Sequence, residues 1–480
     1  MAREAYVILF GRIAQVLTLI ILLRVITGQL SPEEIGKTTI ITSLTAFFAL
    51  LFVNPVGMYI KRQFNDWFGR GLVMRYLGFA LMYLIGITVF STSVVSLVYL
   101  VFEPNWGVSL FWLIGLVAGS LIINTVNQTL IPCFNMLGYR VYWVFFTIVT
   151  LWSGLLFSWL LTQYSSSAEY WMLGQLLGLA VGVLFSIVPF KKIVGSSTGQ
   201  QLKWEVKELK LVLAFTLPIA VTVALNWSQF QSYRFLLGEF SGLEVLGLFS
   251  AGYAVSAGII TNFEATIQQY FHPIFYKAIH GKSDEVIAEI WLEYVNLLIP
   301  FIAVTGIFVV IFSESITHIL VDEKYWVAAK FVALGAVVES VRAISNAYSL
   351  VAHALMRTRV LLASQITGAI SMAMSVRIIF EFWGGEYFWY GLVFSSLLFL
   401  SHLVLTIKFS LQCSYGFRFM LPVMVTSVLF LVIRIILEDP DRGLGGHLML
   451  LSLSGSLYVL FGYFLFRRNL DVEMKYMGRM

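Results

Sequence analysis

The stretch YLGFALMYLIGITVFSTSVVSLVYLV, from Tyr76 to Val101, decides the fold class of this 480-residue chain. It contains no Asp, Glu, Lys or Arg along its whole length. An α-helix crosses a hydrocarbon core of roughly 30 Å with about 20 apolar residues. A membrane-spanning β-strand is shorter and alternates apolar with polar residues. This continuously apolar stretch therefore predicts a membrane-spanning helix.

The composition of the whole chain agrees with this prediction. Hydrophobic residues make up 59% of the sequence and charged residues only 12%, whereas a soluble globular domain has about 25% charged residues. No core of this size hides so much apolar surface from water, which excludes both a water-soluble enzyme and a disordered chain. We expect an all-α integral membrane protein.

Apolar runs of similar length recur along the chain and predict about 14 transmembrane helices. They lie roughly at 6–27, 38–60, 76–101, 107–130, 139–161, 169–190, 210–233, 244–271, 291–313, 325–352, 358–380, 387–407, 418–437 and 447–466. The stretch 191–209, KKIVGSSTGQQLKWEVKEL, separates six of these spans from the other eight. It begins Gly/Ser-rich and ends as a basic amphipathic segment, which predicts a cytoplasmic linker with a helix on the membrane surface.

Lys and Arg concentrate in alternate connections between the spans. With the N-terminus inside, twenty-one basic residues fall in inside segments and four in outside segments. This bias is the positive-inside pattern. We therefore predict a multi-pass membrane protein with both termini in the cytoplasm.

One span carries charged residues at its centre. In 325–352, a polar series steps by three and four residues, which places its members on one helical face. The series is Glu339, Arg342, Asn346, Ser349 and His353. Because a charge at a helix centre costs ~2.5–3.5 kcal/mol, such a face must contact the bundle interior or a wet cavity.

Other spans carry polar and charged residues as well. The polar ones include Asn124, Gln128, Asn226, Gln229 and Glu264, and the basic ones include Arg12 and Arg24. One interpretation is interhelical hydrogen bonding worth about 0.6 kcal/mol per pair, with Glu339 and Arg342 neutralising each other. Snorkelling of basic side chains toward the headgroups is another. We favour a hydrated central cavity with surplus positive charge, which indicates an anionic substrate.

Motifs of catalysis and cofactor binding are missing from the sequence. It has no Walker A sequence, no G-x-G-x-x-G, no H-E-x-x-H and no G-x-S-x-G. Two cysteines and six scattered histidines supply no metal-ligand spacing. We expect neither an enzyme nor a protein with a cofactor or a metal site.

Three stretches carry a family resemblance. They are LLRVITGQLSPEEIGKTTI (Leu22–Ile40), YRFLLGEFSGLEVLGLFSAGYAVS (Tyr233–Ser256) and HPIFY (His272–Tyr276). The chain resembles the multidrug/oligosaccharidyl-lipid/polysaccharide exporter superfamily, particularly its bacterial polysaccharide (Wzx-type) flippases. Ile35 stands where that family usually has an aromatic residue.

The resemblance implies two six-helix bundles around a central cavity, followed by two additional helices. The domains would be 1–190, the linker 191–209, the second bundle 210–410, and a pair of helices with a cytoplasmic tail at 411–480. It also implies alternating access driven by an ion gradient or the membrane potential. Arg24 and Arg234 are the charged residues that match the family pattern.

Together these observations predict a flippase that moves a polyprenyl-diphosphate-linked oligosaccharide across the inner membrane in the synthesis of a surface polysaccharide, such as a lipopolysaccharide O-antigen. The predicted cavity residues are Arg12, Arg24, Arg234, Arg342, Asn124, Gln128, Asn226, Gln229 and Asn346. Glu264 or Glu339 would bind a coupling proton or sodium ion. Membrane lipids and the polymerase and chain-length proteins of the pathway are the expected partners, and nucleic acid is not one.

Two alternatives remain open. A cation-coupled multidrug exporter of the same fold would have an acidic or aromatic cleft that is poor in Arg. A membrane-embedded polysaccharide polymerase would need a large outside loop or an acidic motif at the end of a span.

Overall fold

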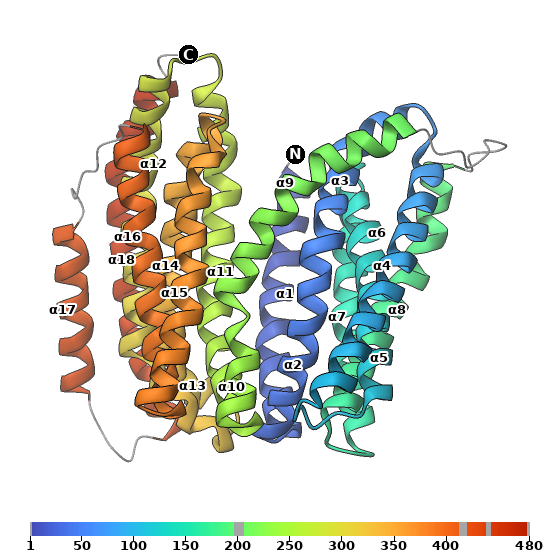
Figure 1. Cartoon of the computed structure of the whole chain (residues 1–480). Coiled ribbons are helices and arrows are strands. Elements are labelled where there is room, and N and C mark those ends of the chain that lie inside the picture. Colours follow the sequence, from blue (N-terminus) through green and yellow to red (C-terminus); the bar gives the residue numbers. More distant parts are fainter. Residues whose placement is uncertain (1, 196–205, 412–419, 438–442, 478–480) are drawn as a thin grey trace. The chain divides into compact units, whose positions relative to one another are not determined.

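A computed structural model describes residues 2–195, 206–411, 420–437 and 443–477, and the regular elements in these ranges are helices (Figure 1). Within them, 11 helices are long and apolar enough to cross a membrane, and two shorter apolar helices lie at Ala14–Gln29 and Leu421–Ile436. The remaining predicted run coincides with α14 (Ala329–Ala354), which carries the charged residues. Each predicted run thus coincides with a helix, and the chain is an all-α, multi-pass membrane protein.

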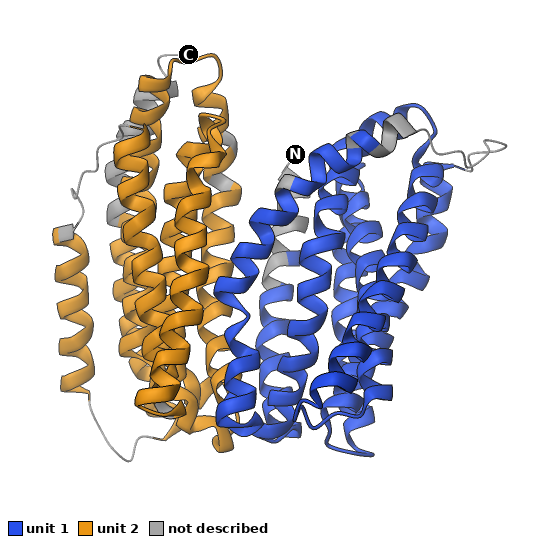
Figure 2. Ribbon diagram, in the orientation of Figure 1, with its two compact units in different colours: residues 1–247 blue, residues 248–480 orange. Residues whose placement is uncertain are grey.

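The first compact unit is Met1–Gly247 (blue in Figure 2). Its helices are α1 (Ala2–Gln29), α2 (Pro32–Phe48), α3 (Asn54–Gly69), α4 (Val73–Phe102), α5 (Leu110–Gly119), α6 (Thr125–Met136), α7 (Arg140–Thr162), α8 (Ala168–Val194), α9 (Val206–Phe230) and α10 (Tyr233–Ser241). Here α7 packs along α8, α6 and α1, and α9 packs against α3. Residues 196–205 of the predicted linker lie outside the described residues, and the predicted domain boundaries stay predictions.

The second compact unit is Leu248–Met480 (orange in Figure 2). It contains most of α11 (Leu243–Ile279), followed by α12 (Asp284–Ile311), α13 (Ser313–Leu320), α14, α15 (Leu361–Phe382), α16 (Phe388–Leu411), α17 (Met420–Ile436) and α18 (Leu444–Met477). Helix α14 packs against α12 and α16, and α13 packs against α18. In lipid, helices associate mainly through close packing and hydrogen bonds.

A glycine seam joins α7 and α8 in the first unit. Gly174, Gly178 and Gly182 recur every four residues of α8 and therefore share one face. A Cβ atom on Gly178 would lie 2.2 Å from the Cα of Gly154, and one on Gly174 would lie 2.3 Å from the Cα of Ser158. The two backbones are in contact along this seam, which is the close approach that small residues permit in membranes.

Two of the stretches that carry the family resemblance contact each other. A Cβ atom on Gly36 of α2 would lie 2.1 Å from the carbonyl oxygen of Leu243, and one on Gly247 would lie 1.7 Å from that of Pro32. The start of α2 and the start of α11 therefore cross backbone to backbone. This crossing requires glycine at both positions, which gives these two glycines of the motifs a structural role.

The carboxylate of Glu34 connects the start of α2 to the start of α8. Its Oε2 accepts a hydrogen bond of 2.7 Å from the backbone N–H of Ala168, and its Oε1 lies 2.7 Å from Nζ of Lys37. The first N–H groups of a helix have no partner within the helix, and a negative charge there is favourable. Glu34 therefore caps α8 from another helix.

Glu34→Ala should lower the free energy of unfolding by about 1 kcal/mol, the usual cost of a lost N-cap. Thermal unfolding of the purified protein in detergent measures this change. Glu33→Ala is the matched control, because the Glu33 side chain is 59% exposed and contacts only Lys37 among the described ion pairs, at 3.4 Å. Equal stability of the two variants would contradict the capping role.

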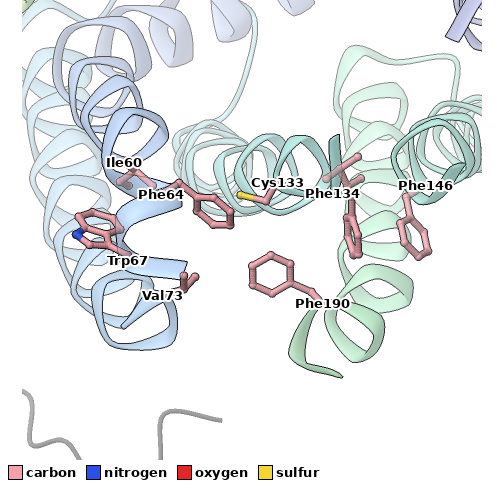
Figure 3. Close-up of a cluster of buried hydrophobic side chains, with 9 residues drawn as sticks. Ile60, Phe64, Trp67, Val73, Cys133, Phe134, Phe146 and Phe190 are labelled. Atoms are coloured by element: carbon pink, nitrogen blue, oxygen red, sulfur yellow. The ribbon is translucent and has the colours of Figure 1, made fainter. Parts of the chain in front are cut away.

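An aromatic core lies within the first unit (Figure 3). It is formed by buried side chains of α3, α4, α6, α7 and α8. They are Ile60, Phe64, Trp67, Val73, Ile131, Cys133, Phe134, Phe146 and Phe190. Two of them, Ile60 of α3 and Phe190 of α8, also line a cavity described below.

Candidate functional site

Two helices of the first unit are interrupted by π-helical turns. The turn η1 (Ala49–Val53) precedes Asn54 and Pro55, and η2 (Ser120–Asn124) joins α5 to α6. Proline lacks an N–H and disrupts the regular ladder of backbone hydrogen bonds. The Tyr83 hydroxyl donates a 2.9 Å hydrogen bond to the Phe52 carbonyl inside η1. Such turns are rare and often occur at functional sites.

Both π-helical turns border a cavity of about 690 Å³ within the first unit. This volume lies in the range of small-molecule sites. The polar part of its lining consists of hydroxyl and amide side chains together with the ammonium group of Lys61. The residues concerned are Thr38, Thr42, Thr45, Asn54, Ser120, Asn124, Thr125, Gln128, Thr129, Gln175 and Gln231. Because so many hydroxyl and amide groups are unusual inside a membrane bundle, this cavity is the candidate binding site of the first unit.

The cavity contains two of the residues that the sequence predicts. Gln128 donates a hydrogen bond of 3.2 Å from Nε2 to Oδ1 of Asn124, one helical turn earlier. Gln175 of α8, another lining residue, donates a hydrogen bond of 2.9 Å from Nε2 to the hydroxyl of Ser158. The Gln128 side chain is exposed, so the amide keeps donor and acceptor positions available for a ligand.

The threonines of α2 are cavity residues that the sequence reading missed. The spacing in the sequence could have revealed them. It steps by four and then three residues, which places Thr38, Thr42 and Thr45 on one face of the helix. Thr42 and Thr45 donate their hydroxyl protons to carbonyls of their own helix, at 2.8 and 2.9 Å. A hydroxyl oxygen that donates its proton can still accept hydrogen bonds through its lone pairs.

A second polar group lies in the second unit and is centred on Arg342 of α14. The guanidinium donates from Nε to Oε2 of Glu339 at 2.8 Å and from Nη2 to Oε2 of Glu264 on α11 at 3.0 Å. Both glutamates are buried, with relative exposures of 4% for Glu264 and 5% for Glu339. Arg342 is therefore bound between two carboxylates from two helices.

Neutral side chains complete this Arg342 cluster. The Tyr253 hydroxyl donates to Oε1 of Glu339. The amides of Gln268 and Asn346 both donate to Oε1 of Glu264, at 2.8 and 2.9 Å. With both carboxylates ionised, the cluster carries one net negative charge, in place of the positive surplus expected around Arg342.

Close packing brings the two helices of the cluster together. A Cβ atom on Gly252 of α11 would lie 2.7 Å from the carbonyl oxygen of Ala328. One on Gly335 of α14 would lie 2.3 Å from the hydroxyl of Ser256. The glycines thus place α11 close enough for Glu264 to reach Arg342.

The other predicted cavity residues lie elsewhere. Arg24 and Asn226 are exposed on α1 and α9, and Arg234 donates from Nη1 to the Ser43 hydroxyl at 3.4 Å. Gln229 is fully buried, and neither atom of its side-chain amide has a hydrogen-bond partner in the described part of the chain. The side chain of Arg12 lies outside the described residues. The structure therefore gathers two sets, one in each unit, and the binding roles of all these residues stay predictions.

The described residues hold no group of three or more His, Cys, Asp or Glu that would suit a metal ion. The polar residues of the first unit are suited to hydrogen bonding with a ligand. The Arg342 cluster of the second unit is suited to binding a charged group.

Comparison with solved structures identifies the fold. The chain is similar to a lipid II flippase MurJ in an inward closed conformation, with a TM-score of 0.70 and 12% sequence identity over 98% of this chain and 100% of the other. It is also similar to an inward-facing multidrug resistance MATE family transporter of the MOP superfamily, with a TM-score of 0.58 and 14% identity over 83% and 96% of the two chains.

The chain has the fold of these two solved structures. No protein-family model and no curated protein matches its sequence. At 12–14% identity, the exporter fold is what these comparisons establish. The prediction of an all-α membrane protein with this fold is confirmed.

Proposed function

We propose that the protein is a flippase that moves a polyprenyl-diphosphate-linked oligosaccharide across the bacterial inner membrane by alternating access. The observation that carries this proposal is the chemistry of the polar cavity in the first unit, whose amides and hydroxyls suit a ligand rich in hydroxyl groups. Transport of a lipid-linked molecule is also the activity by which its structural neighbour MurJ is described.

The physical problem of such a flippase is the head group. A sugar diphosphate does not cross hydrocarbon unaided, because ionised and polar groups in low dielectric cost many kcal/mol. In the proposed mechanism, Asn124 and Gln128 replace water around the sugar hydroxyls. Arg12, Arg24, Arg234, Asn226 and Gln229 of the first unit stay proposed binding residues, as do Arg342 and Asn346 of the second unit.

Energy coupling belongs to the same proposal. A proton or sodium ion would bind at Glu264 or Glu339, where the carboxylates outnumber the one guanidinium that contacts them. Binding of a cation there would compete with Arg342 for Oε2 of either glutamate, and so would change the packing of α11 against α14.

The double substitution Asn124→Leu and Gln128→Leu should lower the initial rate of flipping about tenfold or more. Each lost hydrogen bond leaves a buried sugar hydroxyl unsatisfied, at about 1–3 kcal/mol. The rate is measured in proteoliposomes with a fluorescent polyprenyl-diphosphate oligosaccharide and a membrane-impermeant quencher. Asn135→Leu is the control, since Asn135 is an exposed residue of α6 that is not part of the cavity lining.

A multidrug exporter of the same fold is the second candidate, and the net negative charge of the Arg342 cluster favours it. The same proteoliposomes decide between the two functions when a fluorescent organic cation is added outside them. Uptake of the cation together with no movement of the lipid-linked sugar would overturn the flippase proposal.

A further inference from the structure

A second cavity lies beside the polar one in the first unit. It has a volume of about 300 Å³ and is lined mainly by aliphatic side chains of α3, α4, α6 and α8, among them Leu77, Leu84 and Leu130. Leu81 of α4 belongs to this lining and is also 44% exposed on the apolar outer surface of the unit. The apolar cavity therefore lies beside an exposed apolar residue of a helix that is long and apolar enough to cross a membrane.

The two cavities share a wall of small side chains. Val53, Gly57, Thr125 and Thr129 line both of them. A Cβ atom added to Gly57 would meet nothing within 4 Å. The two cavities therefore adjoin, with open space at Gly57 where they meet.

Each of the two cavities has one lysine in its lining. Lys61 lines the polar cavity and Lys191 the apolar one, and both side chains are exposed. Each directly follows a residue of one aromatic core, Ile60 or Phe190, and these two residues also line the apolar cavity (Figure 3). Lys61 of α3 and Lys191 of α8 are thus next in sequence to two residues of the same core. A compact ammonium group of this kind is a common ligand of phosphate.

We propose that these features form one binding site for a lipid-linked sugar, in which the first unit holds all three parts of the molecule. The prenyl chain enters the apolar cavity beside Leu81, the diphosphate binds between Lys61 and Lys191, and the first sugar lies in the polar cavity. This inference rests on the proposed function and adds the place and posture of the substrate. It assigns the recognition of the lipid to α3, α4, α6 and α8.

The first test is photolabelling of the wild-type protein. The probe is a polyprenyl-diphosphate disaccharide with a diazirine in the first prenyl units, added to the full chain in lipid nanodiscs. We expect covalent adducts within 74–84 of α4 and 126–130 of α6, as located by mass spectrometry. Adducts confined to other helices would overturn the site.

The second test fills the apolar cavity from one side. Leu77→Trp should lower labelling and flipping at least tenfold, because the indole occupies the space of the prenyl chain. Leu97→Trp is the matched control on the same helix, since Leu97 is 62% exposed and is not part of the lining. Equal labelling and flipping by Leu77→Trp and wild type would overturn the proposal.

The third test removes the phosphate ligands. The double substitution Lys61→Gln and Lys191→Gln should weaken probe binding about tenfold or more. Lys192→Gln is the control and should leave probe binding unchanged, because Lys192 is exposed and lines neither cavity. A water-soluble sugar diphosphate without the lipid should compete only weakly with the probe. Strong competition would show that the apolar cavity adds nothing to binding.

These outcomes distinguish failure of the proposed binding site from failure of the proposed flippase function. If the wild type flips the lipid-linked sugar while Leu77→Trp does so equally well, the site fails and the flippase proposal stands. If the wild type moves no lipid-linked sugar at all, the flippase proposal itself fails.

Discussion

Replacing Arg342 by Ala should destabilise the second unit by about 3–5 kcal/mol and abolish transport. The substitution leaves Glu264 and Glu339 buried without their shared cation, and breaking a buried ion pair by removing one partner has a cost of this size. Thermal unfolding in detergent and the proteoliposome assay measure the two effects. Arg377→Ala is the control, because Arg377 is an exposed arginine of α15.

Partial rescue distinguishes loss of charge balance from loss of a substrate contact. Glu264→Gln in the Arg342→Ala background should recover much of the lost stability, because it removes one uncompensated charge, and the difference between the double and single variants measures the coupling. Transport should stay low in the double variant if the cluster binds the coupling ion. Unchanged stability of Arg342→Ala would contradict the contacts at 2.8 and 3.0 Å.

The second large effect is expected at the glycine seam. Gly178→Val places a branched side chain where even a Cβ atom would lie 2.2 Å from the Cα of Gly154, so α7 and α8 have to separate. We expect about 3 kcal/mol of destabilisation, the upper end for an overpacked core, and a lower yield of folded protein. Size-exclusion chromatography and thermal unfolding measure both.

Gly86→Val is the matched control for the seam, since a Cβ atom on Gly86 of α4 would meet nothing within 4 Å. Both substitutions remove a glycine from a membrane helix, so propensity and hydrophobicity change equally. Equal stability of the two variants would show that the close approach of α7 and α8 contributes nothing.

The fold could be predicted largely from the sequence because its main determinant is local. An uninterrupted apolar run such as 76–101 must become a helix in lipid, whatever its neighbours are. The same reasoning found α14 in spite of its charges, since Glu339 and Arg342 are three residues apart and interact within one helix.

The candidate site could be predicted only in part. Asn124 and Gln128 are four residues apart, so the sequence predicts that they share one helical face. Both line the polar cavity. The contact of Glu264 with Arg342 joins residues 78 positions apart and depends on how α11 packs against α14. No spacing rule in the sequence specifies that packing, and the excess of carboxylate around Arg342 was therefore missed.

The π-helical turns and the glycine seam were missed for different reasons. A π-helical turn shifts the helical register by one residue, and Pro55 alone does not reveal on which side the shift occurs. The seam did have a signal, because Gly174, Gly178 and Gly182 repeat every four residues, which is a known pattern of helix association in membranes.

The net charge of the Arg342 cluster has an electrical consequence. A charge that moves through the membrane field gains or loses about 2.3 kcal/mol per elementary charge for each 100 mV. Any rearrangement that carries Glu264, Glu339 and Arg342 across part of the bilayer makes the conformational equilibrium of the second unit voltage-dependent. Protonation of one of the two glutamates would cancel the charge and switch that sensitivity off.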